Sequence, residues 1–438
     1  MYPNYSTPPT PATSPSSPRS PSPISQENCT EQTGDANNSQ SVETKQASTL
    51  DKTHALLLQH ESTISGALDL AKLLAEFFEK PLPEQLNELS SLGIDTETAP
   101  QNQISSLETT VKLLDVYFQE SPLNRQAGGN NIERWQVKDQ KEKLQQLDSQ
   151  QQERLREALN NLNLASDIIS PITEQTNVIL PGAAIPRMLL RPKFALKQNN
   201  IDVVPKSITC LGASRPLNAE IDFITEPTKN QQLFDKIDSY VNAFSDKLGT
   251  EKTEAHAQMA LMDMLREENP DSFLSKQTIH MGFTGGVTYK TQTLTKEGNY
   301  QLANNETTGR ANTEATIVTA LHTLNQLSAD NEEQELLLVS NQPHITAQQL
   351  ATERVAALEP YKDSAITVHA CGDKTALDTT DQLFSGIDSV RKSIQLLNPE
   401  YHVTTNWVKG KEPEILMFRS PKAGEWECLA PTESGITV

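Results

Sequence analysis

Two polar clusters in the C-terminal half carry residue types suited to binding and transforming a charged small molecule. The first opens a predicted helix, and the second follows the apolar stretch 336–339 directly. In open α/β sheets, ligands bind at the carboxyl ends of strands and at helix N-termini. The candidate residues are Arg310, Asn312, Thr313 and Glu314 in the first cluster, and Ser340, Asn341 and His344 in the second. Two such clusters on neighbouring elements predict one shared site.

Two earlier predicted strands, 177–180 and 207–211, also run into small or polar residues. Glycine there lets a backbone approach a ligand closely, and arginine can hold a phosphate or carboxylate. The predicted ligand-binding residues after these strands are Gly182, Ala183, Gly212, Ser214 and Arg215. His344 and Glu220 are the candidate general acid or base, because proton transfer needs a tunable group near the reacting atom.

Each candidate also has a purely structural interpretation. Asn-Thr-Glu at a helix start is what an ordinary N-cap requires, and His344 after a proline turn can be a surface histidine. Cys371, after the predicted strand 365–370, can line the same pocket or only pack. The case for function rests on several polar clusters at equivalent strand ends.

The absence of certain motifs disfavours some cofactors and some catalytic mechanisms. No Gly-x-Gly-x-x-Gly follows the first strand, which disfavours NAD, and no Gly-x-Ser-x-Gly is present, which disfavours a serine nucleophile. No His and carboxylate cluster has the spacing of metal ligands. A divalent cation held by carboxylates stays open as a cofactor, with these candidates: Glu220, Glu254, Glu314 and Asp373.

Composition excludes some partners. The 438 residues carry a net charge of −20, which argues against binding to a nucleic-acid backbone or an anionic membrane surface. The four cysteines form no CxxC pair, which is typical of a reducing compartment. No run of about 18 apolar residues exists, so we expect no Sec signal and no membrane insertion.

The composition and the apolar spacing of the chain predict three parts. Residues 1–50 are rich in Pro and Ser and poor in large apolar side chains, so we expect a disordered tail. Residues 51–172 show apolar stripes at helical spacing, which predict a helical domain or arm, with a coiled-coil surface as an alternative. From 173 to 438, strands alternate with helices, which predicts a Rossmann-like α/β domain.

Within the α/β part we expect a mainly parallel sheet with helices on both faces. Helices are predicted at 231–248, 253–266, 311–327, 346–358 and 381–397, and C-terminal strands at 401–405 and 415–418. The segment 284–305, rich in Gly and Thr, is either a hairpin or a lid over the site.

The ordered motifs resemble the bacterial SanA/YdcF/ElyC family of Rossmann-like proteins. The matching pieces, over roughly residues 177–375, are Gly182, Gly212 with Glu220, Thr253-Glu254, the run Arg310 to Glu314, and Ser340 to His344. The resemblance implies binding of a nucleotide-like or S-adenosylmethionine-like small molecule, with hydrolase activity suspected. Ala213 stands where the family has a second glycine, and the helical part is foreign to the family.

The overall organisation is also similar to that of type IV-secreted bacterial effectors. The shared features are a Pro/Ser-rich N-terminus, a helical part, an α/β part and an acidic C-terminal tail. We therefore expect a cytoplasmic protein, or one delivered into a host cell without a Sec signal.

Two function classes compete. The first is a hydrolase or transferase acting on a phosphate-bearing, nucleotide-like molecule held by Arg215 and Arg310. The second is a non-catalytic module that binds a small molecule and contacts a protein partner through the helical region. The position of His344 relative to Arg310 is the discriminating feature.

Overall fold

The computed structural model describes residues 52–88, 100–125, 137–198, 203–218, 221–224, 226–327, 333–358, 361–362, 364–403 and 407–429. All of them belong to one compact unit that spans residues 46–438. The predicted disordered tail and the candidate acid–base residue Glu220 lie outside the described residues. No described helix is long and apolar enough to cross a membrane.

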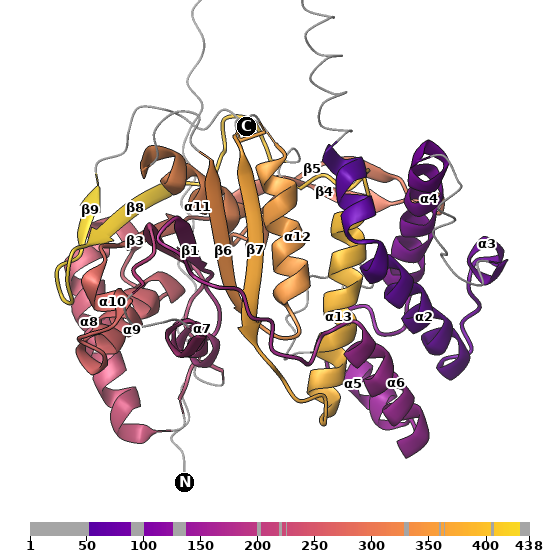
Figure 1. Ribbon diagram of the computed structural model, residues 1–438, viewed down its shortest axis with the longest axis horizontal. Coiled ribbons are helices and arrows are strands. Elements are labelled where there is room, and N and C mark those ends of the chain that lie inside the picture. The colour runs from indigo at the N-terminus through magenta and orange to yellow at the C-terminus, as the bar shows by residue number, and fades with distance from the viewer. Residues whose placement is uncertain are drawn as a thin grey trace, which may run out of the picture. The chain divides into compact units, whose positions relative to one another are not determined.

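A seven-stranded sheet organises the α/β part (Figure 1). Its strands are β1 (Thr176–Leu180), β2 (Ser207–Ala213), β3 (Ile279–Thr284), β6 (Gln334–Asn341), β7 (Ile366–Asp373), β8 (Ile415–Ser420) and β9 (Glu427–Leu429). Their order is β7-β6-β1-β2-β3-β8-β9, and the first five are parallel. β8 and β9 pair antiparallel at one side. The predicted mixed α/β class with a mainly parallel sheet is confirmed.

The chain changes direction across the sheet at β1. After β1 it builds β2 and then β3 on one side, and it later builds β6 and β7 on the other. Ile179 lies opposite Thr209 on one neighbour and Leu338 on the other. Because the five strands are parallel, their carboxyl ends lie along one edge, which we call the carboxyl edge.

Seven helices in the described residues follow these strands. They are α7 (Ile185–Gln198), α8 (Pro227–Leu248), α9 (Glu254–Glu268), α10 (Phe273–Lys276), α11 (Thr313–Leu327), α12 (Ile345–Ala356) and α13 (Thr380–Leu397). Successive residues of β1 enter different hydrophobic clusters, as the strand period of two requires. Val178 and Leu180 join residues of α7, α8 and α9, whereas Ile179 joins residues of α11, α12 and α13.

The N-terminal helices are α2 (Glu61–Phe77), α3 (Glu84–Glu88), α4 (Pro100–Gln119), α5 (Lys138–Gln145) and α6 (Ser149–Asn161), and residues 52–59 are also helical. Of these helices, α2, α4, α5 and α6 pack on α13, whereas α3 packs on α4 (Figure 1). Gly386 of α13 permits the close approach of α6, since a Cβ there would lie 2.9 Å from Leu159 Cδ1. One hydrophobic cluster contains Leu68 of α2, Phe384 of α13 and Leu338 of β6. The helical region and the sheet therefore share a core.

A hairpin connects β3 to α11. Its strands are β4 (Val287–Leu294) and β5 (Tyr300–Gly309), paired antiparallel in a separate sheet. The Tyr300 hydroxyl at its turn donates to Asp115 Oδ2 of α4 at 2.9 Å. At its base, Val287 packs with Ala213, Ala311 and Ala315. The segment that the sequence left open as hairpin or lid is thus a hairpin, held at both ends.

Some predicted elements differ from the structure. Residues 401–403 form no strand, and 404–405 lie outside the described residues. The last apolar stripe within residues 51–172 is divided into α5 and α6, because Asp148 caps α6 by accepting from Gln151 N–H at 2.8 Å. The short strand β9 was not expected, since three residues are too few to show a periodicity.

Candidate functional site

The carboxyl edge gathers polar and small residues from several elements. β1 leads into Gly182 and Ala183, β2 into Ser214 and Arg215, and β6 ends at Asn341. α9 begins there too, because Glu254 N–H donates to the Arg215 carbonyl at 2.9 Å. These contacts form the candidate site.

Arg215 is the most fully engaged cation of this site. Its Nε donates to Glu254 Oε2 at 3.0 Å, and its two Nη atoms donate to both Asp222 oxygens at 3.0 Å. The remaining N–H groups reach the carbonyls of Ala183 at 3.0 Å and Pro216 at 3.4 Å. Burial lowers the pKa of Arg215, but Asp222 and Glu254 outweigh that effect and raise it. All five donors have internal acceptors, so Arg215 positions the two carboxylates.

Asp222 fills the N-terminus of α7. Its carboxylate is fully buried and accepts from the backbone N–H of Ile185 at 2.9 Å and of Asn218 at 2.7 Å, besides Arg215. The first helix after β1 is where an α/β sheet often binds a ligand's phosphate. Here a carboxylate of the chain itself occupies that position.

Glu254 lies in the first turn of α9 and is buried against Gly182. A Cβ on Gly182 would lie 1.8 Å from Glu254 Oε1, so only glycine leaves room for this carboxylate. Burial raises the pKa of Glu254, and the charges of Arg215, Arg310 and Arg191 oppose that shift. A buried carboxyl group with a raised pKa is a candidate for proton exchange.

The side chain of Arg191, in the middle of α7, contacts the end of β6 and the residues that follow β1. Its Nε donates to Asn341 Oδ1 at 2.8 Å, and its Nη1 donates to the carbonyls of Pro181 and Gly182. The side chain is 2% exposed. Burial lowers its pKa to about 9, and the nearby charge of Arg187 acts in the same direction.

Asn341 links Arg191 to the end of β7. Its Nδ2 donates to Asp373 Oδ1 at 2.9 Å. Ser340, one residue earlier, is fully buried and donates its hydroxyl to Gln348 of α12. Asn341 therefore contacts charged residues of the site, whereas the hydroxyl of Ser340 bonds α12 to the strand end.

His344 lies at the start of α12. Its backbone N–H donates to the Asn341 carbonyl at 2.9 Å, its carbonyl accepts from Gln348, and its side chain is 4% exposed. The interpretation as a surface histidine does not fit this burial. Its acid–base role stays a prediction, as does that of Glu220.

The start of α11 is connected to the site by the charge of Arg310. Asn312 caps the helix by accepting from Ala315 N–H at 2.9 Å, and Thr313 is the first helical residue. Glu314 is buried and pairs with Lys392 of α13 at 2.6 Å. Arg310 is exposed, and its charge acts on Glu254.

Two further residues have packing contacts. A Cβ at Gly212 would lie 2.7 Å from Ala255 Cα, so this glycine admits α9 rather than leaving space open at the strand. Cys371 is buried in the cluster that contains α7 and α9, and burial raises the pKa of its thiol to about 12. No group of three His, Cys, Asp or Glu residues in the described parts of the chain is arranged to hold a metal ion.

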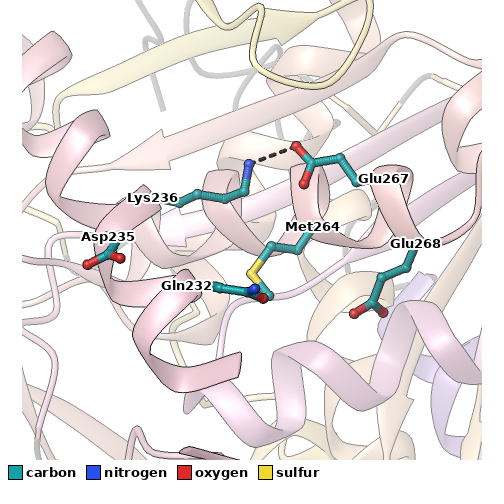
Figure 2. A pocket seen from close by; sticks show the side chains of 6 residues that line it. All are labelled: Gln232, Asp235, Lys236, Met264, Glu267 and Glu268. Atoms are coloured by element: carbon teal, nitrogen blue, oxygen red, sulfur yellow. Dashed lines mark hydrogen bonds and ion pairs between the residues drawn. The ribbon is translucent and has the colours of Figure 1, made fainter. Parts of the chain in front are cut away.

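A hollow on the surface of α8 and α9 lies away from this site (Figure 2). It has a volume of about 460 Å³, and an ion pair of 2.7 Å between Lys236 and Glu267 crosses its lining. Met264 and Glu268 line it about three turns along α9 from Glu254. It brings together none of the candidate residues.

Three residues of the site were outside the predicted set of binding residues. Arg191 lies within α7, and Asp222 lies in a loop. Glu254 was predicted only as a motif residue or a cation ligand. Arg215 and Glu254 are 39 positions apart in the sequence, and Arg191 and Asn341 are 150 positions apart. A helix-start Thr-Glu pair is the one signal that pointed to any of them.

Comparisons of the chain with protein-family models, with curated proteins and with solved structures give no match.

Proposed function

We propose that the α/β part binds a phosphate-bearing, nucleotide-like small molecule at the carboxyl edge. The observation that carries this proposal is that the charges of two further guanidinium groups, Arg191 and Arg310, act on the buried carboxyl of Glu254, besides the saturated Arg215. Guanidinium groups bind phosphate oxygens well, and buried charges with shifted pKa values are typical of binding and catalytic sites.

We also propose that the domain is Rossmann-like, with helices on both faces of the sheet. Two facts support this proposal. The order in which the chain adds the five parallel strands reverses at β1. Alternate residues of β1 also enter two separate hydrophobic clusters with different helices. Ligands of such sheets bind beside the strand at which the order reverses.

The reaction we propose is hydrolysis or group transfer at the bound molecule. The buried carboxyl of Glu254, with its raised pKa, supplies a candidate for proton exchange in addition to His344 and Glu220. Glu254→Gln is expected to bind the molecule and to lose turnover at least tenfold. Product release by the wild type and the variant, at a saturating concentration of the molecule, checks this role.

The test of binding is a thermal unfolding screen of the full chain. AMP, ATP, ADP-ribose, NAD and S-adenosylmethionine are added singly, each with and without Mg²⁺. A ligand present at 100 times its Kd stabilises the folded state by about 2.7 kcal/mol, which raises the unfolding temperature. We expect a shift with at least one phosphate-bearing molecule, and a smaller shift in Arg310→Ala.

The matched control is Arg154→Ala, which removes an exposed arginine of α6 that pairs with Glu76. Its ligand-induced shift is expected to equal that of the wild type. If the folded wild-type chain shows no shift with any of these molecules, the proposed nucleotide-like ligand is wrong.

A second candidate function is binding without turnover, with the helical region contacting a protein partner. The ion pair of Glu254 with Arg215 favours this function. An ion pair stabilises the ionised carboxylate and so opposes its protonation. A ligand that stabilises the chain but is recovered unchanged after prolonged incubation would support this function over catalysis.

A further inference from the structure

Arg191 is a buried cation without a carboxylate partner. Within the described residues, its hydrogen bonds reach only neutral oxygens, those of Asn341, Pro181 and Gly182. No ion pair joins it to a carboxylate in the part of the chain that the structure describes. The charges of Glu254 and Asp373 act favourably on it without a hydrogen bond to it. Burying a charge is costly unless it is paired and hydrogen-bonded, so an anion bound directly to this guanidinium would stabilise it further.

The geometry leaves one face of this guanidinium available. Its hydrogen bonds use Nε and Nη1, and none within the described residues uses Nη2. The adjoining residues Gly182 and Ala183 are small and half-buried. An anionic group bound at Nη2 would leave the other donors free to hold the guanidinium in place.

The alternative positions for an anion at this edge are already used. Asp222 occupies the N-terminus of α7, and the five donors of Arg215 all have internal acceptors. A ligand phosphate at either position would have to displace a buried carboxylate. Arg191 lies between β1 and β6, where the strand order reverses, and requires no such displacement.

We propose that Arg191, rather than Arg215, binds the phosphate of the ligand through Nη2, with Asn341 and the carbonyls of Pro181 and Gly182 orienting its guanidinium. This inference rests on the proposed binding of a phosphate-bearing molecule, and it assigns the residue that recognises the phosphate. The lowered pKa of Arg191 agrees with it, because a bound anion would compensate the burial of this charge.

Substitution of Asp373 provides a second test of the proposal, in which phosphate affinity is expected to rise rather than fall. It reaches Arg191 only through Asn341, and its charge acts favourably on the guanidinium. In Asp373→Asn, the amide oxygen still accepts from Asn341 Nδ2, but the competing negative charge is gone. Phosphate should then bind more tightly.

The experiment measures the affinity of the full chain for AMP and for inorganic phosphate, with adenosine for comparison, by calorimetric titration at constant ionic strength. Arg191→Lys is expected to weaken both phosphate-bearing probes at least tenfold, because an ammonium cannot keep the orienting bonds and also bind the anion. Asp373→Asn is expected to strengthen them two- to fivefold. Lys193→Met, which removes an exposed cation from the same helix, is expected to change neither by more than twofold.

The outcomes separate this inference from the proposed function. If the folded wild type binds neither AMP nor phosphate nor any nucleotide of the screen, both are wrong. If the wild type binds AMP and folded Arg191→Lys binds it equally well, Arg191 does not hold the phosphate, although the proposed function stands. If Arg191→Lys does not fold, an unchanged or weaker affinity in folded Asp373→Asn overturns the inference.

Discussion

At the scale of single residues, charge pairing divides the cations of the carboxyl edge into two kinds. Arg215 faces two buried carboxylates, Asp222 and Glu254, and its donors are satisfied. Arg191 faces neutral oxygens. The first arrangement is typical of a structural ion-pair network. The second leaves Arg191 without a directly bonded carboxylate, which is why we propose it as the phosphate-binding residue. Sequence position alone does not separate them, since both follow strands that end in small residues.

Removing Arg215 should therefore destabilise the fold. Arg215→Met leaves Asp222 and Glu254 buried without their cation, and we expect the free energy of unfolding to fall by about 3–5 kcal/mol. Urea unfolding at neutral pH measures this loss. The exposed arginine of α6 offers the control, since Arg154→Met should change stability little. A loss below about 1 kcal/mol for Arg215→Met would contradict the structural role.

At the scale of elements, the hairpin β4–β5 is held by a buried polar cluster. Asp115 of α4 accepts from Tyr300 and from Asn398 Nδ2, each at 2.9 Å, and Asn398 also donates to the Gly298 carbonyl at 3.0 Å. Tyr300 in turn accepts from Gln395 Nε2 at 3.1 Å. Because β5 leads directly into Arg310, this cluster connects the helical region to the start of α11.

Asp115→Asn tests this cluster through its pH dependence. Burial raises the pKa of Asp115, and the hydrogen bonds from Asn398 and Tyr300 only partly oppose that. The folded state therefore holds the Asp115 proton more tightly than the unfolded state, and this residue destabilises the fold as pH rises. Asparagine does not titrate but loses a carboxylate acceptor, so its cost, about 1–2 kcal/mol near the ordinary pKa of aspartate, should shrink as pH rises above that pKa.

Urea unfolding of both chains across this pH range gives the comparison. Asp235→Asn, at an exposed position of α8, serves as the control and should differ little from the wild type throughout. A cost of Asp115→Asn that grows with rising pH would show that Asp115 stabilises the fold in its ionised form, contrary to this account.

At the scale of the whole molecule, the helical region completes a core that the α/β part also uses. The same hydrophobic cluster includes Leu74 and Leu114 of the helical region, Ile387 and Ile394 of α13, and Leu336 of β6. Covering α13 removes its apolar side chains from water, which is the main favourable term in folding.

A chain of residues 173–438 should consequently fail to behave as an independent domain. Without the N-terminal helices, α13 exposes a large apolar face, and we expect aggregation or a loss of cooperative unfolding. The matched control is a chain of residues 46–438, the limits of the compact unit, which should unfold as the full chain does. Circular dichroism during urea unfolding, together with size-exclusion chromatography, measures both. A cooperative transition of 173–438 at the full-chain midpoint would show two independent domains.

Local pattern accounts for much of the fold. Apolar spacing in the sequence predicted α11, α12 and α13 and the central strands to within a few residues, because periodicity reflects which face of each element is buried. Alternation of strands with helices predicted the mainly parallel sheet. Polar residues at strand ends also indicated which edge to inspect.

Local sequence patterns were sufficient to predict the α/β class, the positions of most elements and a group of polar residues at strand ends. The partners of those residues became evident only from the folded chain. Asp222 occupies a helix terminus and Arg215 is saturated, while Arg191 reaches Asn341 across 150 positions of the chain. The physical reason is that periodicity and capping are local, whereas the burial and pairing of a charge depend on contacts between distant segments.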